Sequence, residues 1–264
     1  MAAELAHEIG PNPDKPVIVF LHGGGWTGWA WDRQVAALSD FHCVTVDLPG
    51  SGASAHLPWR SLDETADRVA RLISEIADTQ QVHLVGLSVG GDVALRVLGR
   101  NAARIESAFI SGIVTSKVTG IPRAVQWVAS LMAGTRVFQR LAANSMGLTG
   151  DRREEFLSTV PRFARSSYTR MVRDVFDGVS LDGLAVCTVP TLVIAGENEP
   201  PLAAESARHV SRVMPDAVAT IADGVGHAWN IEAPGLFNSA VDAWITRREV
   251  TAGLSPARGS RCHG

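Results

Sequence analysis

Cysteine is scarce in this sequence, and the three cysteines present form no recognisable pattern. They stand at Cys43, Cys187 and Cys262, an odd number at wide spacings. Such spacing argues against the paired bridges of small secreted domains, and none of it resembles a cysteine-based metal site. Cys43 and Cys187 lie in apolar segments, which is typical of small buried hydrophobic residues. We therefore expect neither a disulfide framework nor a bound metal.

The sequence also lacks a strong charge excess and a long apolar run. Its formal net charge is −3, which gives no electrostatic reason to expect a nucleic acid or an anionic membrane as a partner. No segment approaches the roughly 20 apolar residues that span a bilayer, so membrane insertion is not expected. The N-terminus shows no basic start followed by an apolar stretch, and hence no signal peptide. The expectation is a soluble, cytoplasmic protein, as a monomer or a homodimer.

Short apolar runs are what the sequence has in abundance. They are rich in β-branched residues, end in Gly, Pro or Asp, and do not alternate with polar residues, which is typical of strands buried on both faces. The runs are Val17–Leu21, Cys43–Asp47, Val82–Leu87, Ala108–Ser111, Thr191–Gly196 and Ala217–Ile221. Helical patterns such as Ser61–Ala77 lie between them. The order of strands and helices predicts an α/β fold, a mainly parallel sheet flanked by helices.

The strand pattern stops between about Ile113 and Ala185. A structureless loop of this length would be unusual, so we predict a helical cap at 113–185, inserted between core segments 1–112 and 186–250. The tail 251–264 is rich in Gly, Ser and Arg and is expected to be disordered. The helix-like segments of the cap are Ala124–Leu131, Thr135–Ala143, Arg152–Ser158 and Ser166–Phe176.

A candidate nucleophile stands at the end of one predicted strand. Val82–Leu87 runs into Gly86-Leu87-Ser88-Val89-Gly90, and a helical pattern follows. A serine hydroxyl is a poor nucleophile unless it is held clear of the sheet beside a base, and a sharp strand-to-helix turn does this. The turn crowds the positions two before and two after the serine, where glycine has no side chain to clash. The same turn aims the Val89 N–H at the place where an oxyanion would form.

A glycine-rich turn after the first predicted strand, His22-Gly23-Gly24-Gly25, offers a second oxyanion donor. A turn of this composition lets the backbone approach a substrate and aim an amide inward. We predict the Gly24 N–H as this donor, with Gly25 as the alternative. His22 is interpreted as a structural residue that braces the loop.

The base and its orienting acid are expected near the C-terminus. His227 lies between glycine and alanine on a loop after the last predicted strand, where it is free to reach the serine. Glu199, three residues past the end of Thr191–Gly196, is predicted to hold the imidazole tautomer, with Glu197 as the alternative. Asp223 stands too near His227 in the sequence to fold back on it.

These residues resemble the α/β-hydrolase superfamily. The order nucleophile, acid, histidine matches Ser88, Glu199 and His227, and the His-Gly turn is similar to the oxyanion loop of that family. Most members carry aspartate where Glu199 stands. The first hairpin strand of the family is not evident here.

The resemblance implies that 113–185 covers the active site and that an ester or lactone of a mainly hydrophobic small molecule is hydrolysed without metal or organic cofactor. Two alternatives stay open: a carbon–carbon hydrolase or cofactor-free lyase at the same site, or a small-molecule receptor. The expected substrate-binding residues are Trp26, Trp127, Met132, Phe138 and Trp229. Further cap residues that could line an acyl pocket are Leu131, Met146, Phe156, Phe163, Tyr168, Met171 and Phe176.

Overall fold

The structure, a computed structural model, describes residues 5–77, 80–120, 135–145, 148–159 and 165–257. Within these residues eight strands form one sheet in the order β1-β3-β2-β4-β5-β6-β7-β8. The six inner strands are parallel, and β1 and β8 pair antiparallel at the two edges. The strands are β1 His7–Ile9, β2 Val17–Leu21, β3 His42–Val46, β4 Val82–Leu87, β5 Ile105–Ser111, β6 Thr191–Gly196, β7 Ala217–Ala222 and β8 Leu254–Pro256.

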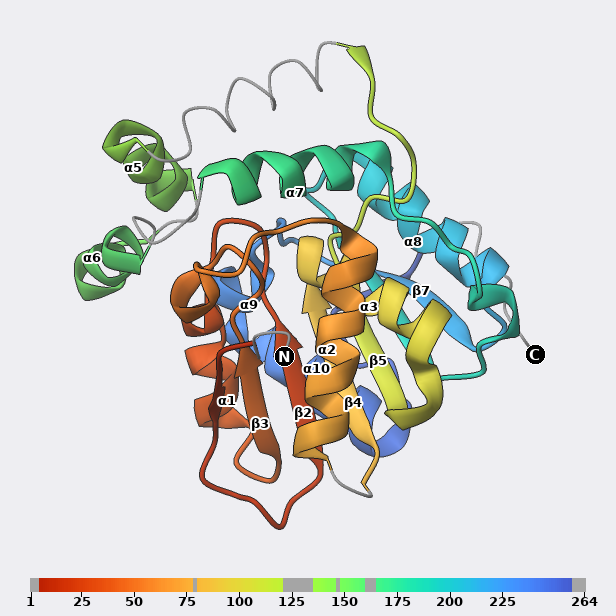
Figure 1. Cartoon of the computed structure of the whole chain (residues 1–264). Helices are drawn as coiled ribbons and strands as arrows, with labels where there is room; N and C mark the ends of the chain where they lie inside the picture. The colour runs from red at the N-terminus through yellow and green to blue at the C-terminus, as the bar shows by residue number, and fades with distance from the viewer. Residues whose placement is uncertain (1–4, 78–79, 121–134, 146–147, 160–164, 258–264) are drawn as a thin grey trace.

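Helices cover both faces of the sheet (Figure 1). The core helices are α1 Asp32–Ala37, α2 Leu62–Ile76, α3 Val89–Asn101, α8 Pro201–Val213, α9 Trp229–Glu232 and α10 Pro234–Arg247. Successive residues of a strand point to opposite faces, so Val17 and Val19 pack with α2, α3 and α8, whereas Ile18 and Phe20 pack with α10. Both faces are therefore buried, as the unbroken apolar runs predicted.

Helix α2 shows how the sequence sets a local boundary. The Ser61 side chain accepts a hydrogen bond from the Glu64 N–H at 3.1 Å, which satisfies one unpaired amide of the first turn. Ala66, Val69 and Ile73 then recur at helix spacing and are buried against the sheet. The helix begins and ends one residue inside the predicted range.

Two edge strands differ from the expectation. Leu254–Pro256 forms β8 beside β7, although the whole tail from 251 was expected to be disordered; residues 258–264 lie outside the described residues. A short first strand, His7–Ile9, pairs with β3, although none was evident in the sequence. Both are three residues long and mix polar with apolar side chains, so neither carries a periodic signal.

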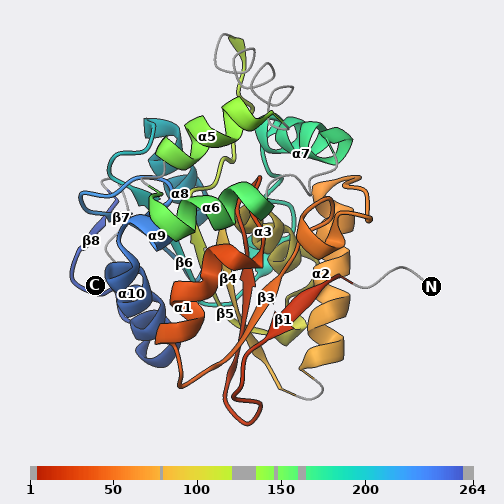
Figure 2. The ribbon, with the colours of Figure 1, turned by 90° about the vertical axis from the view of Figure 1, so that its left-hand side faces the viewer.

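The segment 113–185 contains helices α5 Arg136–Ser145, α6 Gly150–Thr159 and α7 Arg165–Asp177. They lie beyond the end of the sheet where β2, β4 and β5 finish (Figure 2). The two connections to the core pair with each other: Val179 N–H donates to the Val114 oxygen at 3.2 Å, and Val118 N–H to the Phe176 oxygen at 2.8 Å. The expected helix Ala124–Leu131 falls outside the described residues.

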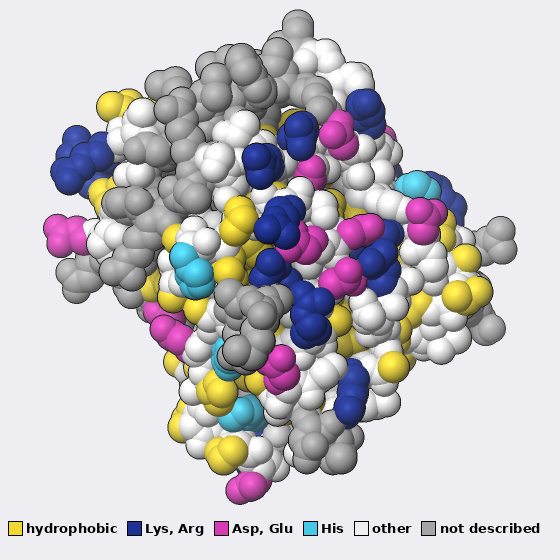
Figure 3. All heavy atoms as spheres, in the orientation of Figure 1, with side chains coloured by type: hydrophobic (Ala, Val, Ile, Leu, Met, Phe, Trp, Pro, Cys, Tyr) yellow, Lys and Arg dark blue, Asp and Glu magenta, His cyan; other side chains and the backbone are white. Residues whose placement is uncertain are grey.

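The described surface carries mixed charges. On the face turned to the viewer in Figure 3, acidic and basic side chains lie interspersed rather than in a patch of one sign. Among the helices that the structure describes, none has the length and apolar character needed to cross a membrane.

Candidate active site

Ser88 occupies a sharp turn between β4 and α3. Its backbone has φ 57° and ψ −126°, a conformation that costs a residue with a side chain about 1–3 kcal/mol. The Ser88 N–H donates to the Ser111 oxygen at 2.8 Å, and the Asp92 N–H donates to the Ser88 oxygen at 3.0 Å. The turn is therefore tied to the end of β5 on one side and opens α3 on the other. It holds the hydroxyl at the N-terminus of a helix.

The two glycines of the motif are required by the space around this turn. A Cβ on Gly86 would lie 2.5 Å from the Gly90 oxygen, and a Cβ on Gly90 would overlap the Leu21 oxygen. The prediction that only glycine fits two residues before and two after Ser88 agrees with this geometry.

The glycine turn after β2 runs beside the serine. A Cβ on Gly23 would lie 3.5 Å from the Ser88 Cβ, and one on Gly24 would lie 3.9 Å from Val89 Cγ1. Gly24 and Val89, the two expected amide donors, are thus neighbours at the mouth of the turn. We expect the N–H groups of these two residues to be the donors that hold an oxyanion.

His22 braces this loop from inside the protein. The Leu48 N–H donates to its Nε2 at 3.1 Å, so Nδ1 carries the proton and donates to the Gly23 oxygen at 2.8 Å. Burial lowers the pKa of the His22 imidazole, while the bond to Gly23 and the charge of Asp47 act in the opposite direction. A neutral imidazole with both ring nitrogens hydrogen-bonded fits the structural role predicted for His22.

His227 and Glu199 meet from two different loops. Their Nδ1 and Oε1 atoms lie 2.6 Å apart, with the His227 side chain 48% exposed and the Glu199 side chain 4% exposed. The other Glu199 oxygen accepts the Gly196 N–H at 2.7 Å, which fixes the carboxylate at the end of β6. The buried acid therefore orients the imidazole through Nδ1, and about half of the His227 side chain stays exposed.

Ser111 and Gly112, which the sequence analysis did not single out, connect the nucleophile turn to the histidine loop. Ser111 accepts the Ser88 N–H through its backbone and the Trp229 indole N–H through its hydroxyl, at 2.8 Å in each case. A Cβ on Gly112 would lie 2.8 Å from His227 Cε1 and 2.9 Å from its Nδ1. The imidazole therefore rests on the residue that follows the anchor of Ser88.

The remaining acidic side chains near this site support the histidine loop. Glu197, the alternative acid, accepts the Gly224 N–H at 2.7 Å. Glu232 accepts the Gly226 N–H at 2.9 Å, and Asn198 donates to the Gly224 oxygen at 3.1 Å. Glu197 thus turns to a neighbouring loop, and the carboxylate that contacts His227 is that of Glu199.

The structure describes the side chains of two of the five expected substrate-binding residues, Trp26 and Trp229. Trp26 lies partly buried against the oxyanion loop, with its Cε3 atom 3.6 Å from a Cβ position on Gly23. Trp229 differs from the expectation: it is fully buried, bonded to Ser111 and packed on Phe237 at 4.6 Å between ring centroids. Trp229 is therefore a core residue that anchors the histidine loop and is not available to contact a substrate. Trp127 and Met132 lie outside the described residues, as does the side chain of Phe138 on α5.

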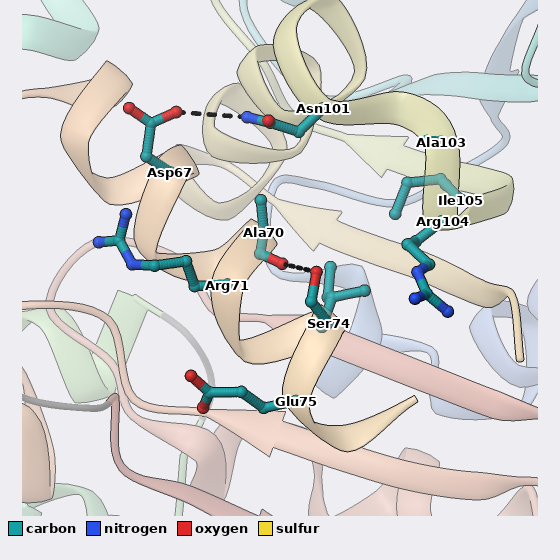
Figure 4. A pocket seen from close by; sticks show the side chains of 10 residues that line it. Asp67, Ala70, Arg71, Ser74, Glu75, Asn101, Ala103, Arg104 and Ile105 are labelled. Atoms are coloured by element: carbon teal, nitrogen blue, oxygen red, sulfur yellow. Dashed lines mark hydrogen bonds between the residues drawn. The ribbon is translucent and has the colours of Figure 1, made fainter. Parts of the chain in front are cut away.

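A separate hollow of about 590 Å³ lies between α2 and the connection from α3 to β5 (Figure 4). It reaches Ile105 at the start of β5, whereas Ser111 and the catalytic candidates stand at the other end of this strand. In its lining, the Asn101 side chain donates to Asp67 Oδ1 at 3.2 Å and the Ser74 hydroxyl donates to the Ala70 backbone oxygen at 2.9 Å. It is therefore distinct from the serine site.

The arrangement as a whole suits acyl transfer. A strained serine, the glycine loop beside it and an acid-oriented imidazole lie at the ends of the parallel strands. In the part of the chain that the structure describes, no group of three or more His, Cys, Asp or Glu side chains is placed to hold a metal ion.

Known proteins are similar to this chain both in sequence and in fold. A model of the alpha/beta hydrolase family matches residues 18–240. The chain is 26% identical to carboxylesterase YbfK of Bacillus subtilis over 250 residues, covering 90% of this chain and 83% of that protein. A crystal structure of a hydrolase from Pseudomonas aeruginosa is similar with a TM-score of 0.74 and 25% identity, covering 92% and 94% of the two chains. An enol-lactonase from Burkholderia xenovorans has the same fold, with a TM-score of 0.73 at 21% identity over 92% and 96%.

Proposed function

The chain belongs to the alpha/beta hydrolase family, and from this premise we propose that it is a serine hydrolase of carboxylic esters or lactones. The observation that carries the proposal is the 2.6 Å contact between Glu199 and His227, with the imidazole resting on Gly112 beside the anchor of Ser88. The similarity to a carboxylesterase supports ester chemistry.

In the proposed mechanism Ser88 Oγ attacks the substrate carbonyl while His227 takes its proton. The N–H groups of Gly24 and Val89 hold the resulting oxyanion. His227 then returns the proton to the leaving alkoxide, and the acyl group stays on Ser88. Water repeats these steps on the acyl-enzyme and releases the acid. Glu199 keeps the proton on Nδ1 and stabilises the imidazolium.

The partly buried aromatic surface beside the site supports a mainly hydrophobic substrate. Trp26 and Trp29 pack against a small cluster formed by Ala143, Leu148 and Phe156 of the cap. Apolar walls with few fixed charges favour an uncharged molecule.

Turnover of p-nitrophenyl butyrate by single variants tests the mechanism. Ser88→Ala and His227→Ala should each lower kcat by about 10⁴-fold or more, because removing either group abolishes the activated nucleophile. Glu199→Gln should cost less than either, since the imidazole remains. Thermal unfolding of each variant checks that the fold is intact.

Glu197→Gln is the matched control, two residues from Glu199 on the same loop and bonded to Gly224 rather than to His227. It should turn over at close to the wild-type rate. Unchanged kcat in Ser88→Ala or His227→Ala would remove that residue from the mechanism. A larger loss in Glu197→Gln than in Glu199→Gln would overturn the assignment of the acid.

A further inference from the structure

Helix α7 of the cap lies directly over the oxyanion loop. A Cβ on Gly24 would lie 2.7 Å from Met171 Cε, and one on Gly25 would lie 3.5 Å from Tyr168 Cε2. The two side chains are three positions apart on α7, so they share one face of the helix, and that face is turned to the loop. Met171 is 6% exposed. It belongs to the buried apolar cluster that also contains Val89 and residues of α2, α3 and α8.

This roof is fixed to the core by specific contacts. The Trp59 indole N–H donates to Asp174 Oδ2 at 2.8 Å, and the Trp59 backbone N–H donates to Ser167 Oγ at 3.0 Å. Trp59 itself is fully buried. Both ends of the helical segment that carries Met171 are thus held by one core residue, and α7 cannot lift at this point without breaking these bonds.

The topology decides which part of a substrate faces Met171. The sheet order β2-β4-β5-β6 puts the loop after β2 on one side of Ser88, and Gly112, Glu199 and His227 on the other. The leaving group must lie on the histidine side, because His227 returns the proton to it. The other two substituents of the reacting carbon, the oxyanion and the acyl group, therefore lie away from His227, on the side of the loop after β2 and of Met171.

We infer that Met171 is a specificity-determining residue that limits the bulk of the acyl group at the carbon next to the reacting carbonyl. The inference rests on the proposed function. Met171 Cε lies against Gly24, in the space that a Cβ on Gly24 would occupy, so a branched acyl group beside the reacting carbonyl would meet the methionine. The thioether side chain is flexible, and it yields to small groups at low cost.

The test compares p-nitrophenyl acetate with p-nitrophenyl pivalate, which share a leaving group and differ in branching at the acyl carbon. In Met171→Ala the ratio of kcat/KM for pivalate to that for acetate should rise by about tenfold or more, because several buried heavy atoms are removed from the acyl side. Met171→Leu, which leaves a smaller gap, should raise the ratio in the same direction by less. This second variant keeps the test valid if Met171→Ala folds poorly.

Met214→Ala is the matched control, since Met214 is a methionine 1% exposed in the same core cluster, at the end of α8. It should lose stability like Met171→Ala and keep the wild-type ratio. A ratio unchanged in both Met171 variants, or raised equally in Met214→Ala, overturns the inference. Wild-type protein that hydrolyses neither ester speaks instead against the proposed function, so the two failures are distinct.

Discussion

Gly112, a residue without a side chain, leaves the space that the His227 ring occupies. Gly112 has φ +68°, and the space that its Cβ would fill is occupied by the His227 ring and, at 3.4 Å, by Glu199 Oε1. Any larger residue would therefore press on the hydrogen-bonded pair that orients the imidazole. We expect Gly112 to act as a positioning residue through His227.

Gly112→Ala should lower kcat by about 10²-fold, the effect expected when a catalytic group moves by about 1 Å. The downfield ¹H NMR resonance of the Nδ1 proton shared by His227 and Glu199 should shift or disappear, because the added methyl displaces the ring. This resonance reports on the hydrogen bond directly and is independent of ester turnover.

Gly224→Ala separates steric contact from backbone strain. Gly224 also has a positive φ, +73°, and stands on the histidine loop, but no atom lies within 4 Å of its Cβ position. In both variants the alanine is strained by a positive φ, at a cost of about 1–2 kcal/mol. Only in Gly112→Ala does the added methyl group contact the His227 ring. Equal losses of kcat in the two variants, with the resonance retained in both, would contradict the positioning role of Gly112.

The catalytic residues and their supports differ in how far the sequence reveals them. Ser88 and His227 stand in local patterns of strand, glycine and loop, and Glu199 follows a strand end, so local sequence patterns predict all three as catalytic candidates. Gly112 and Met171 acquire their roles from contacts with segments more than 100 positions away along the chain. Nothing in their immediate sequence reports such contacts, and the same holds for the burial of Trp229 against Phe109.

At the scale of elements, the connection between cap and core covers a buried acid on helix α3. Asp92 lies one helical turn after Ser88 and is fully buried. Neither carboxylate oxygen has a close hydrogen-bond partner in the described part of the chain, and the backbone amide of Val114, at the start of the cap, faces it. Burial raises the pKa of the Asp92 carboxyl well above 3.8, and the Val114 amide acts in the opposite direction.

This pKa shift makes stability depend on pH. Well below pH 3.8 the carboxyl is protonated in both the folded and the unfolded chain, so its titration does not change stability there. As pH rises through 3.8 the unfolded chain ionises while the folded chain stays protonated, so stability falls until the folded pKa is passed. Asp92→Asn lacks this loss. Its free energy of unfolding, measured by urea at pH 4, 6 and 8, should gain on that of wild type as pH rises.

An exposed aspartate provides the comparison. Asp40 is exposed in the turn before β3, and Asp40→Asn should follow the wild-type dependence on pH. A constant difference between Asp92→Asn and wild type at all three pH values would show that Asp92 ionises in the folded protein as it does in the unfolded chain.

At the scale of the whole molecule, the sequence predicts the inner strands of the sheet. It does not predict the two edge strands. The runs Val17–Leu21, Val82–Leu87 and Thr191–Gly196 have the predicted bounds, because each is buried on both faces and ends at a turn residue. Strands β1 and β8 depend on the neighbours to which they pair. The proposed catalytic groups come from four segments that parallel strands bring to one end of this sheet.

The rate of Ser88 labelling by a fluorophosphonate tests the central claim most directly, because this reagent reacts only with an activated serine. Peptide mass spectrometry should find the adduct on Ser88, and the rate constant should fall by at least about 10³-fold in His227→Ala, which removes the base. Folded wild-type protein that stays unlabelled, or that is labelled as fast as His227→Ala, would contradict the account.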